Sequence, residues 1–280
     1  MQMNSRPPVA IGGVGGSGTR LIAEILSRLN YFIGSDLNHQ NDNLWFTLLF
    51  KRIDILQASR QEFNYYVNLF LRRMNGMTVF SQQEKQDLQR LAMVDRGQHD
   101  LEWLADRVNS FLSQCSENRA TIRWGWKEPN THVVLDRLIG AIPSLRYIHV
   151  ARNGLDMAHS NNMNQLELWG RPFLGLNIVP IDPRHSLKYW CRVHRRILDI
   201  ASDMPGRFLL LNYDEFCKDP DKGFGKLFDY LGERVDSTEL RGHLRLVTPP
   251  PSIGRFRAHG LSMFDGDDIA FVESLGFPIY

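Results

Sequence analysis

The stretch that decides the fold reads Pro8-Val-Ala-Ile-Gly-Gly-Val-Gly-Gly-Ser-Gly-Thr-Arg-Leu-Ile-Ala-Glu-Ile-Leu26. Its apolar run Val9 to Val14 predicts a short buried strand, residues 15–18 a loop, and Thr19 to Leu29 a helix. Such a loop presents backbone N–H groups at the positive end of a helix dipole, where phosphate binds without a charged side chain. The alternative is a tight turn that merely uses glycine. Glycines at positions 12, 13, 15, 16 and 18 exceed what a turn needs, so we favour a phosphate loop.

The glycines meet only half of the P-loop consensus G-x-x-x-x-G-K-[ST]. Gly13 and Gly18 have the right spacing, but Thr19-Arg20 stands where Lys-[ST] is expected. The missing lysine is the residue that reaches the β- and γ-phosphates of a nucleoside triphosphate, which argues against an ATPase, a GTPase or an ATP-dependent kinase. The sequence therefore predicts a ligand with phosphate at this loop but no triphosphate.

Short apolar runs alternate with helical patterns along the rest of the chain, as is typical of a parallel sheet covered by helices on both faces. Strands are predicted at Thr121 to Trp126, Arg146 to Ala151 and Phe208 to Tyr213. Helices are predicted at Thr131 to Ile142, Ser186 to Met204 and Asp268 to Leu275. We expect a single α/β domain over residues 1–280, a three-layer α/β/α fold with a mostly parallel, P-loop-like central sheet. Residues from 44 to about 115 form a helical insertion after its first strand–helix unit.

Composition and charge exclude several classes of protein. The chain has 33 Lys and Arg against 31 Asp and Glu, a formal net charge of +2, which gives no surface-wide field for nucleic acid. No uncharged stretch reaches the ~20 apolar residues of a membrane span, and no signal-peptide core follows Arg6. Cys115, Cys191 and Cys217 are scattered and odd in number, which favours buried thiols in a reducing, cytoplasmic compartment over disulfides or zinc.

Three segments in order resemble the sulfotransferases that use 3′-phosphoadenosine 5′-phosphosulfate (PAPS). They are Gly-Ser-Gly-Thr at 16–19, Val150-Ala-Arg-Asn-Gly-Leu-Asp-Met-Ala-His-Ser160, and Leu211-Asn-Tyr-Asp-Glu-Phe-Cys-Lys-Asp-Pro220. The resemblance is closer to the bacterial, tyrosyl-protein and heparan-type branch than to the cytosolic phenol-type branch. It implies PAPS as donor and 3′-phosphoadenosine 5′-phosphate (PAP) as product. No metal is expected, since no His, Cys and Asp cluster has the spacing of metal ligands.

The resemblance also implies roles for individual residues. It assigns binding of the 5′-phosphosulfate to the loop residues Gly15, Gly16, Ser17, Gly18, Thr19 and Arg20. It assigns binding of the 3′-phosphate to Arg152 and Ser160, and a place near the nucleotide to Tyr213. Ser252-Ile-Gly-Arg-Phe-Arg257 is similar to the family's nucleotide-closing loop, so Arg255 and Arg257 are expected as second contacts to the 3′-phosphate. The alternatives are a surface ion pair for Arg152, a bond to its own backbone for Ser160, and solvation for the last two arginines.

The catalytic assignments rest on the same resemblance. Lys127 stands where family members carry a lysine for the sulfuryl group, but Pro129 stands where cytosolic members have the histidine base. A carboxylate just after the first helix then serves, which makes Asp36 the first choice and His39 the second. Asp36 also fits a turn or a helix cap, and His39 an exposed loop. Position 16 lacks the usual cation, so Arg20 and Lys127 are expected to share its role in catalysis.

The sequence therefore predicts sulfuryl transfer from PAPS to an acceptor hydroxyl by in-line displacement. The alternatives are a P-loop-type nucleoside or small-molecule kinase and a catalytically weak PAPS-binding protein. The acceptor is expected to be a small molecule, a glycan or a peptide, and not a nucleic acid. Aromatic residues of the helical insertion form either a wall for the acceptor or part of the core: Trp45, Phe46, Phe50, Tyr65 and Tyr66.

Overall fold

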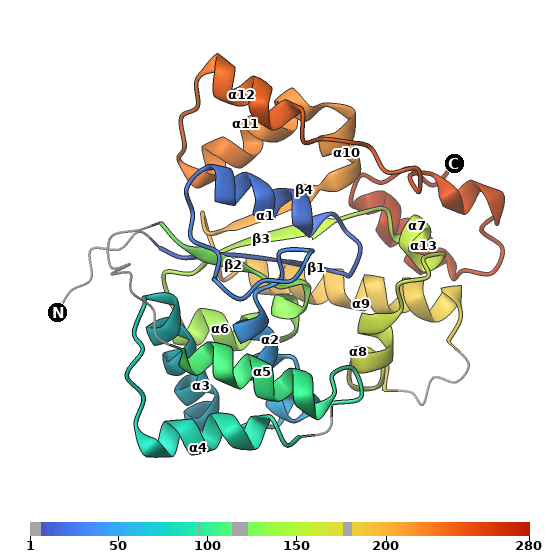
Figure 1. The fold of residues 1–280 in the computed structure, drawn as a ribbon. Coiled ribbons are helices and arrows are strands. Elements are labelled where there is room, and N and C mark those ends of the chain that lie inside the picture. Colours follow the sequence, from blue (N-terminus) through green and yellow to red (C-terminus); the bar gives the residue numbers. More distant parts are fainter. Residues whose placement is uncertain (1–6, 95, 114–122, 176–180) are drawn as a thin grey trace. The chain divides into compact units, whose positions relative to one another are not determined.

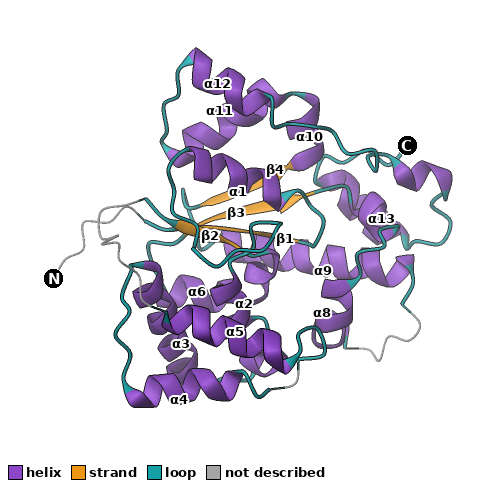
Figure 2. Ribbon diagram, in the orientation of Figure 1, coloured by secondary structure: helices purple, strands orange, loops and turns teal. Residues whose placement is uncertain are grey.

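The computed structural model describes residues 7–94, 96–113, 123–175 and 181–280. At its centre lies a parallel four-stranded sheet in the order β2-β1-β3-β4, flanked by helices (Figure 1, Figure 2). The strands are β1 (Val9–Gly13), β2 (Gly125–Lys127), β3 (Arg146–Ala151) and β4 (Phe208–Asn212). Every residue of β1 and β2 is buried, as expected for strands covered on both faces. The predicted α/β fold with a parallel, P-loop-like sheet is confirmed.

The chain divides into two compact units, each built from two separate stretches. Unit 1 combines Met1–Ile11 with Leu26–Arg146, and unit 2 combines Gly12–Ile25 with Tyr147–Tyr280. Strand β1 therefore begins in unit 1 and ends in unit 2. Helix α1 (Thr19–Arg28) begins in unit 2 and ends in unit 1.

Unit 1 contains strand β2, paired with β1 in a register that sets Lys127 opposite Ile11. Its helices are α2 (Leu44–Phe50), η1 (Ile53–Leu56), α3 (Arg60–Met74), α4 (Gln82–Leu91), α5 (Leu101–Leu112), η2 (Pro129–Val134) and α6 (Leu135–Ala141). The helical pattern predicted from Leu44 onward is thus present, as several short helices. Predicted strand residues 121–122 lie outside the described residues.

The core of unit 1 is aromatic. The ring of Phe46 stacks on Trp126 at 5.7 Å between centroids, and Phe70 meets the same indole edge-on at 5.2 Å. Trp45, Phe46 and Phe50 are all almost fully buried. These side chains therefore belong to the core and not to a wall open to an acceptor.

Unit 2 packs helices around β3 and β4, whose register pairs Ala151 with Asn212 at their carboxyl ends. Its helices are α7 (Gly154–Ala158), α8 (Asn164–Leu174), α9 (Pro183–Ala201), α10 (Tyr213–Lys218), α11 (Pro220–Leu231), α12 (Ser237–Leu244), η3 (Arg255–Ala258) and α13 (Gly266–Ser274). Helices α7 and α9 approach closely at Gly154, where a Cβ would lie 2.8 Å from the Trp190 ring. Only glycine permits that contact.

Two predicted helices differ in detail from the observed ones. The helix expected from Thr131 begins as the 3₁₀ turn η2, with Pro129 at its first position and Glu128 as its N-cap, before α6 follows. Helix α9 begins earlier than predicted, because Asp182 caps it and Pro183 supplies its first residue. The thiols of Cys191 and Cys217 are buried and free, and Cys115 lies outside the described residues. Among the described helices, none has the length and apolarity to cross a membrane.

Candidate functional site

The glycine loop between β1 and α1 has a backbone shape that depends on two glycines. Gly16 and Gly18 have φ angles of +88° and +94°, a region that side chains with a Cβ rarely adopt. A Cβ on Gly18 would lie only 2.3 Å from the ring of Tyr213. The loop therefore packs directly on Tyr213, and the resemblance already assigned that residue to the nucleotide.

Ser17 is the residue whose environment indicates a ligand. Its side chain is 1% exposed, and among the described residues its Oγ has no hydrogen-bond partner. Burying a hydroxyl without a partner costs about 1–3 kcal/mol. The hydroxyl precedes the first turn of α1, where backbone N–H groups also lack intrahelical acceptors. A phosphate oxygen would satisfy both, so the residues present fit a phosphate group.

Arg152 joins the loop to two other segments of unit 2. Its Nη1 donates to the carbonyl of Gly16 at 3.3 Å, and its Nη2 donates to Ser252 Oγ at 2.9 Å. Its Nε lies 3.5 Å from Asp214 Oδ1, and its guanidinium carbon lies 6.0 Å from the centroid of the Tyr213 ring. Three side chains and the loop backbone thus meet around one buried guanidinium.

Tyr213 and Asp214, the two residues that follow β4, both have raised pKa values. Burial raises the pKa of Tyr213 to about 12, and the neighbouring Cys217 thiol, which shares a hydrogen bond with the Tyr213 hydroxyl, adds to the increase. Burial also raises the pKa of Asp214, although Arg152 and the backbone N–H of Asn153, at 2.9 Å, favour its charged form.

Ser160 and Arg255 lie close together in the fold. Ser160 follows the end of α7, outside the helix, and its Oγ accepts from the backbone N–H of Asn162 at 3.1 Å. Its own hydroxyl hydrogen is left to donate. Arg255 donates to the carbonyl of His159 at 3.0 Å, one residue before Ser160. Both predicted contacts to the 3′-phosphate therefore border the same turn.

Asp156 fixes the segment that carries Arg255. Its buried carboxylate accepts from the backbone N–H groups of Gly254 at 2.7 Å and Phe256 at 3.1 Å. Arg257 is placed differently. Its described contacts are with the carbonyl of Tyr280 and the ring of Phe256, and they do not join it to Arg152 or the loop.

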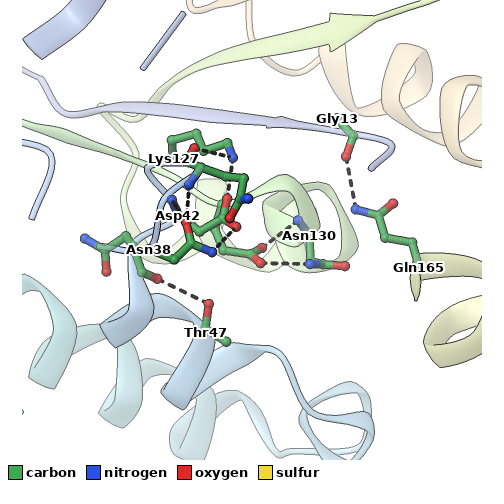
Figure 3. A network of polar contacts seen from close by, with 10 residues as sticks. Gly13, Asn38, Asp42, Thr47, Lys127, Asn130 and Gln165 are labelled. Atoms are coloured by element: carbon green, nitrogen blue, oxygen red, sulfur yellow. Dashed lines mark hydrogen bonds and ion pairs between the residues drawn. The ribbon is translucent and has the colours of Figure 1, made fainter. Parts of the chain in front are cut away.

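In unit 1, Lys127 ends strand β2 with its side chain 3% exposed. Its ammonium group donates to the carbonyl of Gln40 at 3.0 Å and forms an ion pair with Asp42, as Figure 3 shows. An ammonium group has three N–H bonds, so these two partners leave one for a further acceptor.

Asn38 organises the loop that holds Lys127. Its Oδ1 accepts from the backbone N–H groups of Gln40 and Asp42, each at 2.9 Å, and its Nδ2 donates to Asp42 Oδ2 at 2.8 Å (Figure 3). Asp42 is therefore presented to Lys127 in a fixed position. Sequence reasoning did not single out Asp42, and the only signal for it is the polar run from Asn38 to Asn43.

Neither candidate base contacts Lys127 through a described bond. Asp36 Oδ1 accepts from Arg107 Nη1 at 2.8 Å, and the Asp36 side chain is 12% exposed. The N-cap of α2 is Asn43, whose Oδ1 accepts from Phe46 N, so the capping alternative for Asp36 is not observed. His39 is exposed, and Arg20 is exposed in the first turn of α1.

Glu128, next to Lys127, is a buried carboxyl group that sequence reasoning did not assign. Its two oxygens accept from the backbone N–H of Asn130 at 2.6 Å and from Asn130 Nδ2 at 2.8 Å. Burial raises its pKa to about 7, and Asp42 adds to the increase, while Lys51 and Lys127 oppose it. The folded protein therefore keeps a proton on Glu128 at pH values where the unfolded chain has lost it.

This difference predicts a pH dependence of stability. Between about pH 4.5 and pH 7 the folded state binds the extra proton, so the free energy of unfolding falls as pH rises, by up to about 1.4 kcal/mol per pH unit. Glu128→Gln, which cannot ionise, should remove this fall in urea unfolding curves recorded across that range. The exposed Glu102→Gln is the control and should keep it. An unchanged slope in E128Q would show that Glu128 is not its source.

Within the described ranges, no group of three or more His, Cys, Asp or Glu side chains is placed to hold a metal ion. A sequence profile described as "Sulfotransferase family" matches residues 7–237, which include every predicted site residue except Arg255 and Arg257. No curated protein matches the chain.

Two solved structures are similar across nearly the whole chain. One is the sulfotransferase domain from the Synechococcus PCC 7002 olefin synthase, with 17% identity, a TM-score of 0.52, and coverage of 99% of this chain and 97% of that one. The other is the sulfotransferase domain from the curacin biosynthetic pathway, with 14% identity, a TM-score of 0.51, and coverage of 98% and 99%. At these identities the likeness shows the shared fold alone.

Proposed function

Because this chain belongs to the sulfotransferase family, we propose that it transfers the sulfuryl group of PAPS to an acceptor hydroxyl. Family membership makes it a sulfotransferase-type enzyme, and the donor and the acceptor are the parts that we propose. The observation that supports PAPS is the bond from Arg152 to the loop carbonyl of Gly16. This bond joins a guanidinium, a group that binds phosphate, to a phosphate loop of the same unit. Two such groups match the two separate phosphate groups of PAPS.

The nucleotide takes the following contacts in this proposal. The loop from Gly15 to Thr19 binds the 5′-phosphosulfate through its backbone N–H groups and the Ser17 hydroxyl, with Arg20 at the first turn of the helix. Arg152 and Ser160 bind the 3′-phosphate, with Arg255 and Arg257 as second contacts. Tyr213 lies beside the loop and borders the nucleotide.

The transfer step needs a stabilised leaving group and a base. The acceptor oxygen forms its bond to sulfur as the bond from sulfur to the 5′-phosphate oxygen breaks, and PAP leaves with the electron pair. The remaining N–H of Lys127 stabilises charge on the sulfuryl oxygens, with Arg20 sharing that role. Asp36, or His39 as second choice, takes the acceptor's proton. Asp42 acts through Lys127, whose position it holds.

The acceptor is proposed as the hydroxyl of a small molecule, a glycan or a peptide. We also propose a cytoplasmic location, which the free buried thiols of Cys191 and Cys217 support.

Thermal unfolding with different nucleotides tests the proposal. PAP at about 100 times its dissociation constant should stabilise the folded protein by about 2.7 kcal/mol, whereas ATP with Mg²⁺ should not. Transfer of labelled sulfate from PAPS to a panel of phenols, alcohols, sugars and peptides then identifies the acceptor. Stabilisation by ATP–Mg²⁺ and not by PAP would instead indicate a kinase. PAP binding without any transfer would indicate a PAPS-binding protein with little activity.

A further inference from the structure

The segment between α7 and α8 lies directly against the glycine loop. Gln165, in the first turn of α8, donates its Nε2 to the carbonyl of Gly13 at 3.2 Å (Figure 3). Asn162 lies just before that helix, and its side-chain amide is close to Gly15 and Gly16. A Cβ placed on Gly15 would lie 3.4 Å from Asn162 Nδ2, and one on Gly16 would lie 3.9 Å from it. These are ordinary van der Waals distances, so the amide lies directly against both residues of the loop.

The two amides differ in what they bind. The Gln165 side chain is buried and its Nε2 is used by the loop. Asn162 is exposed, and among the described residues none accepts a hydrogen bond from its Nδ2. Its backbone is nevertheless fixed, because its N–H donates to Ser160 Oγ at 3.1 Å. Asn162 is thus a donor held at the loop, accessible to solvent and without a protein acceptor.

A second, independent observation indicates that the loop takes an anion. Ser17 Oγ is buried inside the same loop and has no partner among the described residues. The glycines at 15 and 16 bring no donor of their own beyond the backbone, and Arg20 is exposed on α1. An anion bound at the loop could therefore accept hydrogen bonds from the buried Ser17 hydroxyl and from the exposed Asn162 amide.

We propose that the side-chain amide of Asn162 donates a hydrogen bond to the 5′-phosphate of the nucleotide bound at the loop. This inference rests on the proposed function and adds a binding residue to it. A hydrogen bond to a charged acceptor changes an equilibrium constant by about 10–100-fold. The amide carries no charge, so its contribution depends little on ionic strength, unlike that of a lysine or arginine.

Binding of three nucleotides by isothermal titration calorimetry tests the inference. PAP carries both phosphates, adenosine 5′-monophosphate carries only the 5′-phosphate, and adenosine 3′-monophosphate only the other. Asn162→Ala should weaken binding of PAP and of the 5′-monophosphate by about 10-fold or more, and leave the 3′-monophosphate unchanged. Asn162→Asp should weaken the first two further, because a carboxylate repels the phosphate. The neighbouring exposed Asn161→Ala is the matched control and should bind all three like the wild type.

The outcomes separate this inference from the proposed function. Wild-type binding of PAP with an unchanged affinity in N162A would overturn the role of Asn162 and leave the function standing. Equal losses for the 5′- and 3′-monophosphates would also overturn it, because the effect would then not belong to the 5′-phosphate. A wild-type protein that binds none of the three nucleotides would overturn both. Equal melting temperatures of N162A and N161A confirm that the comparison is between folded proteins.

Discussion

Lys127→Ala is expected to lower the rate of sulfuryl transfer by about 10²–10³-fold, the usual cost of removing one donor aimed at developing charge. Its PAP affinity should stay close to that of the wild type, because the nucleotide contacts proposed above come from other residues. The rate of labelled-sulfate transfer and PAP binding, measured on the same preparation, give the two numbers. An unchanged rate would remove Lys127 from the mechanism.

A second variant keeps this prediction testable if the alanine protein unfolds. Lys127 is buried and paired with Asp42, and breaking such a pair typically costs about 3–5 kcal/mol of stability. The double variant Lys127→Met, Asp42→Asn removes both charges and keeps the side-chain volume, so it should be more stable than Lys127→Ala and equally slow. Asp42→Asn alone keeps the ammonium and loses its ion pair, and should give an intermediate rate.

Arg152→Ala is expected to weaken PAP binding by about 10²–10³-fold. Its guanidinium is the buried cation bonded to the Gly16 carbonyl, and a bidentate contact to a phosphomonoester is among the strongest hydrogen bonds in proteins. Arg152→Lys keeps the charge without the planar fork and should lose about 10-fold. Calorimetric titration with PAP and with adenosine 5′-monophosphate measures both variants.

The two nucleotides show which phosphate Arg152 binds. The loss should be large for PAP and small for the 5′-monophosphate, because the latter lacks the 3′-phosphate. The control is Arg184→Ala, which removes an arginine of the same unit whose side chain is 61% exposed and paired with Asp182. Equal losses for both nucleotides in R152A would assign the guanidinium to the 5′-phosphate or to support of the loop.

The central sheet could be predicted largely because β1, β2 and nearly all of β3 are buried. Such burial favours strands rich in apolar residues, and the predicted strand from Arg146 to Ala151 coincides with β3. Helices α8, α10, α11 and α12 were not predicted. Helices α10 and α12 are short and largely exposed, so their residues show little periodicity.

Within the candidate site, the positions of the glycine loop and of Arg152 could be predicted because a motif there coincides with the end of a strand. The other parts of the site depend on contacts between distant segments. Asp42 and Lys127 are separated by 85 positions in the sequence, and Asp36 and Arg107 by 71. The local sequence around these residues does not indicate that they pair. Asn162 lies in a polar turn whose composition is that of any exposed turn. Tertiary structure alone brings its amide to Gly15.

The division of both units into two stretches of chain has a consequence for how the protein folds. Unit 2 needs Gly12–Ile25 and Tyr147–Tyr280 together, so the phosphate loop cannot reach its native surroundings until the whole of Leu26–Arg146 has been synthesised. Closing so long a connection costs entropy before any contact repays it, although each doubling of its length adds only about 0.6 kcal/mol. Contacts that are distant in sequence slow folding. The glycine loop should therefore be among the last parts of the protein to gain protection from hydrogen exchange during refolding.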